Sequence, residues 1–387
     1  MAAANHRRSR SPQANRTQRR SPPANRRRSR SPASPPATAS LPYFPPELIP
    51  EVARRLTSLQ DFFALRAACR AYRAHLPLTS SNLASQAPLL FVPFEDTESH
   101  ALFHPTLRRI HRFRFHRTPP ASDDEYTVTD FHSLGCRLAI YEIRGLVGQP
   151  SRCNLSIVDL FTGEQTFRSS PTKGMSRILL YGDLVLTWNY FDRAIRYCHL
   201  AAADWNVASI IEPYKLHGLI CVNGVLYALV TPGYILAVIE LSENQNSVEL
   251  ALLGGNLDSS TVHMHEECPP QLHLAECCGE LILISTMEFD PRVYHVFKWK
   301  FGDAKWERIT SLGGCTLFLA DDRFVGCLGP HHKDIRGDSI YITELTDGDW
   351  YEYSLDDGSF NRFVAEYPGG AVPKDRCTPV WVLPSMY

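Results

Sequence analysis

The residues with the clearest capacity for chemistry are histidines and cysteines gathered in one stretch of the chain. In order they are His263, His265, Cys268, His273, Cys277 and Cys278. A zinc site needs four such ligands in a tetrahedral arrangement and usually takes them from paired short spacings. The spacings here match no standard zinc finger. We therefore favour a surface loop with buried cysteines, and we predict no metal site and no cofactor.

A second candidate is the serine in Gly337-Asp338-Ser339-Ile340, which resembles a hydrolase serine motif. The apolar residues after it predict a strand, and no matching oxyanion or His-Asp context accompanies it, so a turn into a strand is the simpler interpretation. The chain contains no G-x-S-x-G, no G-x-x-x-x-G-K-[ST] and no H-E-x-x-H. We predict no catalytic residues and a non-enzymatic protein. An enzyme assisted by a metal in the His/Cys stretch is the weaker alternative.

The first 40 residues form a cationic tail. They hold ten arginines and no acidic residue, and Ser-Pro pairs recur every ten residues. Ser11, Ser21 and Ser31 are candidate sites of proline-directed phosphorylation. With nothing apolar to bury, residues 1–40 are predicted to be disordered. Such arginine runs bind nucleic acid, acidic surfaces or nuclear import receptors, or remain solvated without a specific partner.

The composition indicates a soluble protein of two or three structural units. The 387 residues are 44% hydrophobic and 21% charged, with a formal net charge of −1. No run of eighteen apolar residues occurs, so we expect no membrane span, and the arginine-rich start does not resemble a secretory signal. The eleven cysteines are an odd number in a large chain. We therefore expect a reducing compartment, the nucleus and/or the cytoplasm, with the cysteines as small apolar core residues.

Two apolar series after the tail predict short helices within residues 41–80. Pro45-Pro46 suits a helix start, and Leu48, Val52 and Leu56 then recur every four residues. The second series is Phe62, Leu65, Cys69, Tyr72 and Leu76. A unit this small buries too little surface to be stable alone, so its apolar side chains need a partner in this chain or in another protein.

The segment "LPYFPPELIPEVARRLTSLQDFFALRAACRAYRAHL" resembles the F-box motif over its whole length. The matching residues are Leu41, Pro42, Pro46, Glu47, Leu48, Ile49, Val52, Leu56, Leu65, Arg66, Cys69, Arg70, Tyr72 and Arg73. Tyr72 stands where the motif usually has Trp. The resemblance implies a trihelical module that docks on a Skp-type adaptor and, through it, on a cullin. The adaptor contacts that it implies are Leu41, Pro42, Pro46, Leu48, Ile49, Val52, Leu65 and Cys69. The alternative is an ordinary helical hairpin packed on its own domain.

Residues 87–387 contain short apolar runs bounded by turn residues, which predict strands. A glycine between two such runs recurs at Gly135, Gly182, Gly224, Gly279 and Gly326. Tryptophans recur late in the same frame, at Trp205, Trp306 and Trp350. Intervals of 42 to 55 residues between the glycines are typical of β-propeller blades, which must stack in a ring to bury both faces. We predict about six blades, with seven possible, and the C-terminal "PVWVLPSM" as the strand that closes the ring.

This region also resembles the KIB-type, kelch-like β-propeller domain that follows the F-box in many plant F-box proteins. The resemblance rests on "SNLASQAPLLFVP", "VNGVLYALVTPGY", "TLFLADDRFVGCLGP", "GDSIYITE", "WYEYSLDDGSF" and "PVWVLPSM". The expected protein is therefore mainly β: a small trihelical F-box at residues 41–80, then a propeller at 87–387. We expect polar residues on exposed loops of one propeller face to contact a target protein.

The resulting hypothesis is a non-catalytic substrate receptor of an SCF-type (Skp-cullin-F-box) ubiquitin ligase. Its partners would be a Skp-type adaptor, a cullin reached through that adaptor, and a target protein that the sequence does not identify. The alternative is a nuclear scaffold associated with nucleic acid or chromatin through the Arg-rich tail. Under the first hypothesis we do not expect nucleic acid as a partner, except through weak binding to that tail.

Overall fold

The computed structural model divides the chain into two units, Met1–Phe44 and Pro45–Tyr387. The residues that it describes, all in the second unit, are 45–56, 59–78, 83, 86–93, 100–105, 109–113, 125–146, 152–160, 163–169, 177–190, 192–202, 204–242, 247–255, 257, 271–286, 290, 292–321, 323–330, 332, 335–344, 349–364 and 378–384. The Arg-rich tail with Ser11, Ser21 and Ser31 lies outside the described residues, as do Leu41 and Pro42.

Three short helices follow the two prolines, as the apolar spacing predicts. They are α1 (Leu48–Ala53), α2 (Leu59–Ala67) and α3 (Arg70–His75). The amide of Leu48 donates to the Pro45 carbonyl at 3.0 Å, which starts the first turn. The Cys69 sulfur accepts from the amide of Tyr72 at 3.4 Å and so caps α3. None of the helices that the structure describes has the length and apolar character needed to cross a bilayer.

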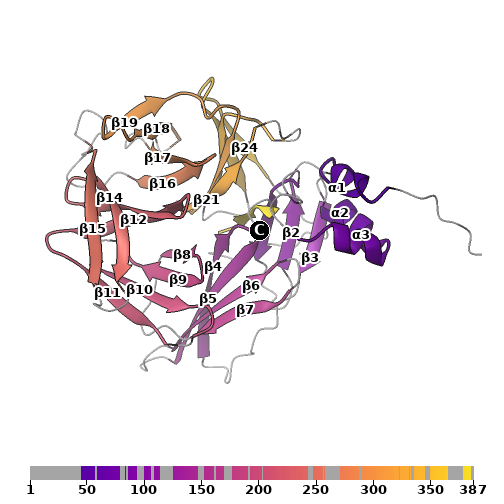
Figure 1. Cartoon of the computed structure of the whole chain (residues 1–387), viewed down its shortest axis with the longest axis horizontal. Coiled ribbons are helices and arrows are strands. Elements are labelled where there is room, and N and C mark those ends of the chain that lie inside the picture. Colours follow the sequence, from indigo (N-terminus) through magenta and orange to yellow (C-terminus); the bar gives the residue numbers. More distant parts are fainter. Residues whose placement is uncertain are drawn as a thin grey trace, which may run out of the picture. The chain divides into compact units, whose positions relative to one another are not determined.

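The strands of the described residues form six blade-like groups arranged around a centre (Figure 1). Blade 1 contains β25 (Val380–Val382), β1 (Leu89–Pro93), β2 (His100–His104) and β3 (Arg109–Phe113). Blade 2 contains β4 (Glu125–Leu134), β5 (Arg137–Leu146), β6 (Arg152–Asp159) and β7 (Gln165–Ser169). Blade 3 contains β8 (Arg177–Tyr181), β9 (Leu184–Trp188), β10 (Ala194–His199) and β11 (Asn206–Ile210).

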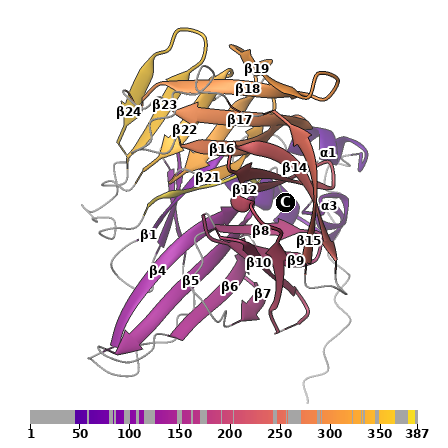
Figure 2. The same ribbon diagram turned by 90° about the vertical axis from the view of Figure 1, so that its left-hand side faces the viewer.

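The remaining three blades complete the ring, and the strands of blade 5 lie one above another when the ring is turned by 90° (Figure 2). Blade 4 contains β12 (Lys215–Val222), β13 (Val225–Thr231), β14 (Ile235–Ser242) and β15 (Ser247–Gly254). Blade 5 contains β16 (Leu272–Cys277), β17 (Glu280–Thr286), β18 (Tyr294–Lys300) and β19 (Lys305–Ile309). Blade 6 contains β20 (Thr316–Ala320), β21 (Arg323–Leu328), β22 (Ser339–Thr343), β23 (Trp350–Ser354) and β24 (Phe360–Phe363).

Two features depart from a ring of separate four-stranded meanders. Blades 3 and 4 join into one eight-stranded sheet, because their outermost strands β11 and β15 pair in parallel, with Ile210 opposite Val248. In blade 6 the hairpin partner β21 lies on the inner side of β20, and β20 then pairs in parallel with β22. This arrangement places β21, and not β20, beside β16 at the centre of the ring.

The C-terminal strand closes the ring, as the sequence predicts. β25 pairs with β1, with Trp381 opposite Leu90, so the last described strand completes the first blade. Trp381 is fully buried. Its ring centroid lies 5.3 Å from Phe318 and 6.0 Å from Tyr341, both in blade 6. The closing strand therefore packs against the last blade as well as pairing within the first.

Tight turns explain most of the glycine periodicity. Gly135, Gly182, Gly224 and Gly279 all have positive φ and all lie in two-residue turns between the first and second strands of their blades. Glycine adopts this conformation without steric cost, which favours it in such hairpins. The interpretation is wrong for Gly326, which lies within β21 beside a register shift. The turn of blade 6 follows β20 instead, where Asp321 takes the positive φ.

The tryptophans mark a shared strand position. Trp205 immediately precedes β11 and Trp306 lies in β19, and both strands are the fourth of their blades. Trp350 begins β23, which is the fourth strand of blade 6 and is followed by a fifth, β24. The interval between Trp306 and Trp350 therefore spans one blade, and all three rings pack against aromatic neighbours.

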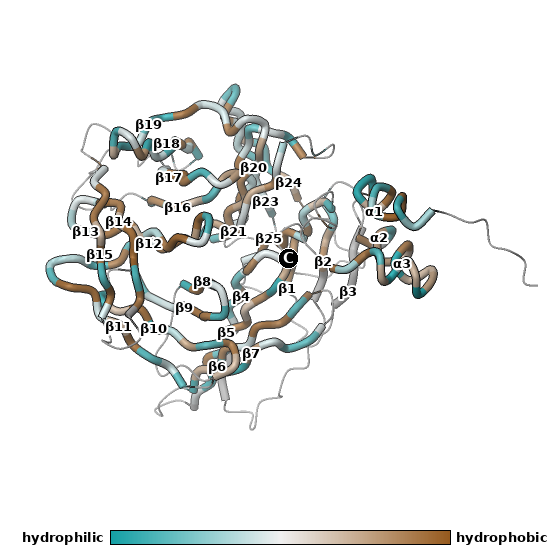
Figure 3. The backbone as a smooth tube through the Cα atoms, in the orientation of Figure 1, coloured by the Kyte–Doolittle hydropathy of each residue, from teal (hydrophilic) through white to brown (hydrophobic). Residues whose placement is uncertain are grey.

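The helices and the ring share one apolar core. Ile49, Ala53, Phe62 and Leu76 are buried in the same cluster as the residues Leu89, Leu90, Phe91 and Val92 of β1. In Figure 1 the helices lie outside the ring near β2 and β3. Hydrophobic residues run along the strands, whereas the helices carry both hydrophobic and hydrophilic positions (Figure 3).

Candidate functional site

A cavity of about 110 Å³ occupies the centre of the ring. Its wall consists mainly of the innermost strands β4, β8, β12, β16 and β21, with Val380 of β25 completing it. The innermost strands of a propeller face its central channel, so their side chains converge although they are far apart in sequence. The cavity has room for several water molecules or for a small part of a ligand.

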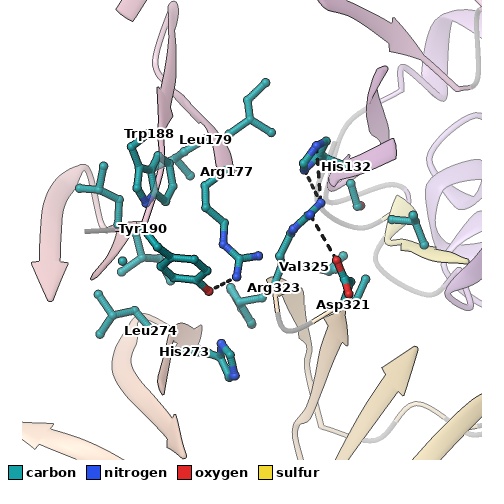
Figure 4. A pocket seen from close by; sticks show the side chains of 18 of the residues that line it. His132, Arg177, Leu179, Trp188, Tyr190, His273, Leu274, Asp321, Arg323 and Val325 are labelled. Atoms are coloured by element: carbon teal, nitrogen blue, oxygen red, sulfur yellow. Dashed lines mark hydrogen bonds and ion pairs between the residues drawn. The ribbon is translucent and has the colours of Figure 1, made fainter. Parts of the chain in front are cut away.

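One side of the cavity is organised around Arg323 of β21 (Figure 4). Its Nη1 lies 2.5 Å from His132 Nδ1, and its Nη2 lies 3.3 Å from Asp321 Oδ2 and 3.4 Å from Asp130 Oδ2. His132 Nε2 lies 3.0 Å from Asp130 Oδ2. These contacts connect blade 6 to blade 2 across the channel.

The geometry determines the protonation of this cluster. A guanidinium can only donate, so His132 Nδ1 must accept from Arg323, and the His132 proton must lie on Nε2, where it is donated to Asp130. Burial and the charge of Arg323 lower the pKa of His132, which keeps the imidazole neutral. Burial alone would raise the pKa of Asp130, but the hydrogen bond from His132 and the charge of Arg323 hold that pKa well below its usual range.

The opposite side is aromatic and carries a second guanidinium. Arg177 of β8 donates to the Tyr190 hydroxyl, and its Cζ lies 4.4 Å from the centroid of the Tyr190 ring. His217 of β12 lies between aromatic rings, 5.3 Å from Tyr190 and 5.1 Å from Tyr234. Its Nε2 is 3.2 Å from the carbonyl oxygen of Leu272, an acceptor, so Nε2 carries the proton. Burial lowers the pKa of His217 to about 4, so this imidazole is also neutral near pH 7.

The cavity therefore offers several kinds of polar contact in a wall that is partly apolar. Arg177 and Arg323 supply charged donors, Asp130 and Asp321 supply acceptors, and the aromatic rings supply flat apolar surface. A few convergent polar groups in a concave apolar site are typical of ligand sites. The arrangement can hold a polar side chain, a chain terminus or a small polar molecule.

Of the channel residues, the sequence singled out only His273, as a candidate metal ligand, and for target contacts it favoured exposed loops on one propeller face. Most of the lining comes from strands, because the ring points its inner strands at the cavity. One signal was available: Arg177, His132, His217 and His273 each lie in the strand that precedes a glycine turn of the repeat. Those four side chains all line the cavity.

The predicted adaptor contacts take different positions in the structure. Leu48 is 48% exposed and Cys69 is exposed, whereas Pro46, Val52 and Leu65 are half-buried. Ile49 is 1% exposed and lies in the core shared with the ring. The free chain therefore presents Leu48 but not Ile49, because Ile49 lies on the face of α1 that packs inward.

The His/Cys stretch does not form a single cluster among the described residues. His263, His265 and Cys268 lie outside them. His273 lines the central cavity, whereas Cys277 and Cys278 lie where β16 ends and gather with two cysteines from blade 6. No pattern in the sequence connects Cys277 and Cys278 with Cys315 and Cys327.

The serine motif is a turn, as predicted. Asp338 has a positive φ of 52°, and Ser339 begins β22. The Asp338 carboxylate accepts from the amides of Leu312 at 2.5 Å and Gly314 at 3.1 Å, and from the Ser311 hydroxyl. These contacts bind two loops of blade 6 together, which is a structural role for the motif.

Comparison with known proteins places the chain in a family. Residues 102–363 match the KIB1-4 beta-propeller family. No curated protein matches the chain. Solved structures that resemble it include the beta-propeller domain of Myceliophteria_thermophila Cps50 (Swd1), which is 10% identical, with a TM-score of 0.37, over 71% of this chain and 86% of that one.

Two further structures are similar at the same low level of identity. One is a functionally unknown protein from Desulfotomaculum acetoxidans DSM 771, 11% identical with a TM-score of 0.37, covering 76% of this chain and 99% of that one. The other is HIRA(644-1017), 14% identical with a TM-score of 0.29, covering 49% of this chain and 54% of that one. The family match covers more than half of the 387 residues and agrees with the six-bladed ring, so this chain belongs to the KIB1-4 beta-propeller family.

Proposed function

We propose that this chain is the substrate-receptor subunit of an SCF-type E3 ubiquitin ligase. In this proposal the helices α1–α3 dock on a Skp-type adaptor and the propeller holds a target protein. A separate ubiquitin-conjugating enzyme carries out the chemistry, so this chain needs no catalytic residue. The observation that carries the proposal is that Leu48 of α1 is 48% exposed, whereas Ile49 and Ala53 of the same helix lie in the core shared with the ring.

The two faces of α1 support this division of roles. Ile49 and Ala53, one turn apart, are buried against the ring. Leu48 and Val52, also one turn apart, lie on the neighbouring face, where Leu48 is exposed and Val52 is half-buried. Leu65 of α2 is half-buried as well. Contiguous exposed apolar patches mark interaction sites, and in this proposal Leu48 and Val52 belong to such a patch.

The core that the helices share with the ring fixes the orientation of the ring relative to a bound adaptor. Besides the buried apolar contacts, Gln86 Nε2 donates to the Leu56 carbonyl at 2.6 Å, which connects the segment before β1 to the segment after α1. Arg66 Nε donates to the Leu76 carbonyl at 2.8 Å within the helical module itself. The helices thus pack on blade 1 and are not joined to it only by a linker. An adaptor bound to them would hold the ring, and a target in its channel, in one orientation, which raises the effective concentration of the target at the conjugating enzyme.

The central cavity is the part of the propeller best suited to hold a target. Arg177 and Arg323 lie on opposite sides of it and belong to blades 3 and 6. A loop or terminus of a target protein that enters the channel would meet donors, acceptors and aromatic surface at once. A target segment would have to match contacts from several blades at once, which makes its recognition specific and dependent on the intact ring.

The docking claim is tested by co-purification of a Skp-type adaptor with the natural chain and with Leu48→Asp. Burial of a leucine side chain contributes roughly 1.5–3 kcal/mol, and a buried unpaired carboxylate adds a further cost. We therefore expect the apparent affinity for the adaptor to fall at least about tenfold. The measurement is titration of purified adaptor, with circular dichroism to show that both chains are folded.

Leu252→Asp is the matched control. Leu252 is 44% exposed, close to Leu48, but it lies on β15 in blade 4. The same substitution there should leave adaptor binding unchanged. If the two variants bind the adaptor as well as the natural chain does, the helices are not the docking surface and the proposal fails.

A further inference from the structure

Four cysteine sulfurs converge where blades 5 and 6 meet. The Sγ atoms of Cys277, Cys278, Cys315 and Cys327 all lie within 4.8 Å of one another. Cys278 Sγ is 3.2 Å from Cys315 Sγ, and Cys327 Sγ is 3.6 Å from Cys277 Sγ. The remaining cysteines among the described residues lie on other elements and do not belong to this group.

The spacing fits one metal ion. Zinc bound by thiolates has Zn–S bonds of ~2.3 Å, so the sulfurs of a tetrahedral site lie ~3.8 Å apart. The two closest pairs here, at 3.2 and 3.6 Å, and the 4.8 Å limit for the whole set lie on either side of that value. Calcium and magnesium prefer oxygen ligands, whereas tetrahedral sulfur sites select zinc or iron.

The backbone around the cluster is fixed by its own hydrogen bonds. Cys278 occupies the β16–β17 turn with a positive φ of 51°, and Asn223 Nδ2 of blade 4 donates to the carbonyl of the next residue, Gly279, at 3.0 Å. The amide of Asp338 donates to the Cys315 carbonyl at 2.8 Å. Cys327 lies in β21, which is adjacent to β16. These contacts preorganise the ligands and limit the entropy lost when a metal binds.

Binding of a divalent cation displaces the thiol protons, and the charge of the cation balances the resulting thiolates. Cys278 is exposed, which leaves a route for the metal to enter.

From this geometry we infer that Cys277, Cys278, Cys315 and Cys327 bind one Zn²⁺ ion, as a structural site that fastens blade 5 to blade 6. The site is separate from the central cavity and from the helices proposed to dock on the adaptor. It replaces our sequence-based expectation of no metal site, which considered Cys277 and Cys278 only with their sequence neighbours.

The first test measures bound metal in the full-length chain, purified under reducing conditions and passed through a weak chelator. Elemental mass spectrometry should find about one zinc per chain. Because Cys278 is exposed, Cys278→Ser removes a ligand without opening the core, and the retained zinc should fall at least tenfold. Cys69→Ser, at another exposed cysteine, should retain the full amount.

The main measurement of the second test uses the natural chain and therefore does not depend on the folding of a variant. Zinc is removed from the natural chain and Co²⁺ is added, which should produce the thiolate-to-cobalt charge-transfer band and the intense visible absorption of a tetrahedral site. Cys315→Ser should weaken the band, and Cys198→Ser, a buried cysteine of blade 3, should leave it unchanged.

Three outcomes would overturn the inference. The first is a folded chain that holds no zinc and gives no cobalt–thiolate band. The second is an intact mass two hydrogens lower, with a peptide that joins Cys278 to Cys315, which would make the cluster a disulfide. The third is equal zinc in Cys278→Ser and Cys69→Ser, which would place the metal elsewhere in the chain.

Discussion

His217 shows how a single side chain in the channel wall ties stability to pH. It is buried between Tyr190 and Tyr234, it donates to the Leu272 carbonyl, and its pKa falls to about 4. In the unfolded chain the pKa of a histidine is ~6.5. As the pH falls below that value, the unfolded state takes up a proton that the folded state does not, so the free energy of unfolding decreases until the pH reaches about 4.

The prediction is that His217→Gln loses less stability than the natural chain when the pH falls from ~7 to ~5. Glutamine keeps a donor near the Leu272 carbonyl but does not titrate. The lowered pKa of His217 corresponds to a decrease of about 2 kcal/mol in the free energy of unfolding over that interval, and the variant should not show this decrease. Urea unfolding at both pH values measures the difference.

The control for this experiment is His199→Gln, at a histidine that is exposed and paired with Asp183. It should follow the natural chain at both pH values. If the stability of His217→Gln depends on pH as strongly as that of the natural chain, then burial does not keep His217 neutral in the folded protein.

At the scale of one element, the short strand β25 determines whether the ring is closed. Only Val380, Trp381 and Val382 form it, yet all three are buried. Trp381 contacts Phe318 and Tyr341 of blade 6, and Trp350 lies 6.2 Å from it. One side chain thus joins the last blade to a strand that completes the first.

Trp381→Ala should therefore destabilise the whole ring. Removal of a fully buried tryptophan leaves a cavity and costs about 3–5 kcal/mol in the free energy of unfolding. Denaturant unfolding of the purified chain measures this loss. Phe301→Ala is the comparison, because Phe301 is 59% exposed and should cost about 1 kcal/mol or less. Equal losses for the two variants would show that closure through β25 is not what holds the ring.

Elements with a local signal were predictable from the sequence, and contacts between distant blades were not. The hairpin turns at Gly135, Gly182, Gly224 and Gly279 follow from the need for positive φ, and the closing strand follows from a terminal apolar run. Gly326 misled because glycine also occurs at irregular points inside a strand. The helices were predicted from apolar spacing, but nothing local told which face would pack on the ring.

The candidate sites depend on contacts that no local pattern encodes. Arg323 meets His132 across the channel although the two are 191 residues apart in sequence, and Cys278 meets Cys315 across 37 residues. Their closeness results from the order of the blades and from the place of β21 inside β20. Proximity in the sequence groups Cys277 with His273, whereas proximity in space groups it with Cys315 and Cys327.

At the scale of the whole molecule, the tail and the folded unit carry opposite charge. Residues 1–40 contain ten arginines, whereas the rest of the chain has an excess of acidic side chains. Under the proposed function the tail is not needed for adaptor docking. Under the alternative, a nuclear scaffold, the tail is the main source of binding to nucleic acid.

Deletion of residues 1–40 separates these two hypotheses. We expect the shortened chain to bind a Skp-type adaptor with unchanged affinity, because the exposed apolar face of α1 is retained. Any binding of the full chain to duplex DNA should weaken steeply as the salt concentration rises and should disappear in the shortened chain. Fluorescence anisotropy with labelled DNA, beside the adaptor titration, measures both. Loss of adaptor binding on deletion would show that docking needs the tail.

The pairing of β11 with β15 has a consequence for how the ring can move. Main-chain hydrogen bonds join the outermost strands of blades 3 and 4, whereas their innermost strands β8 and β12 are the two free edges of the joint sheet at the channel. If the ring loosens, we expect it to separate between blades that share no paired strands. Blades 3 and 4 should then move together as one rigid sheet. Any widening of the channel would then occur between other blades, whose outermost described strands are not paired with one another.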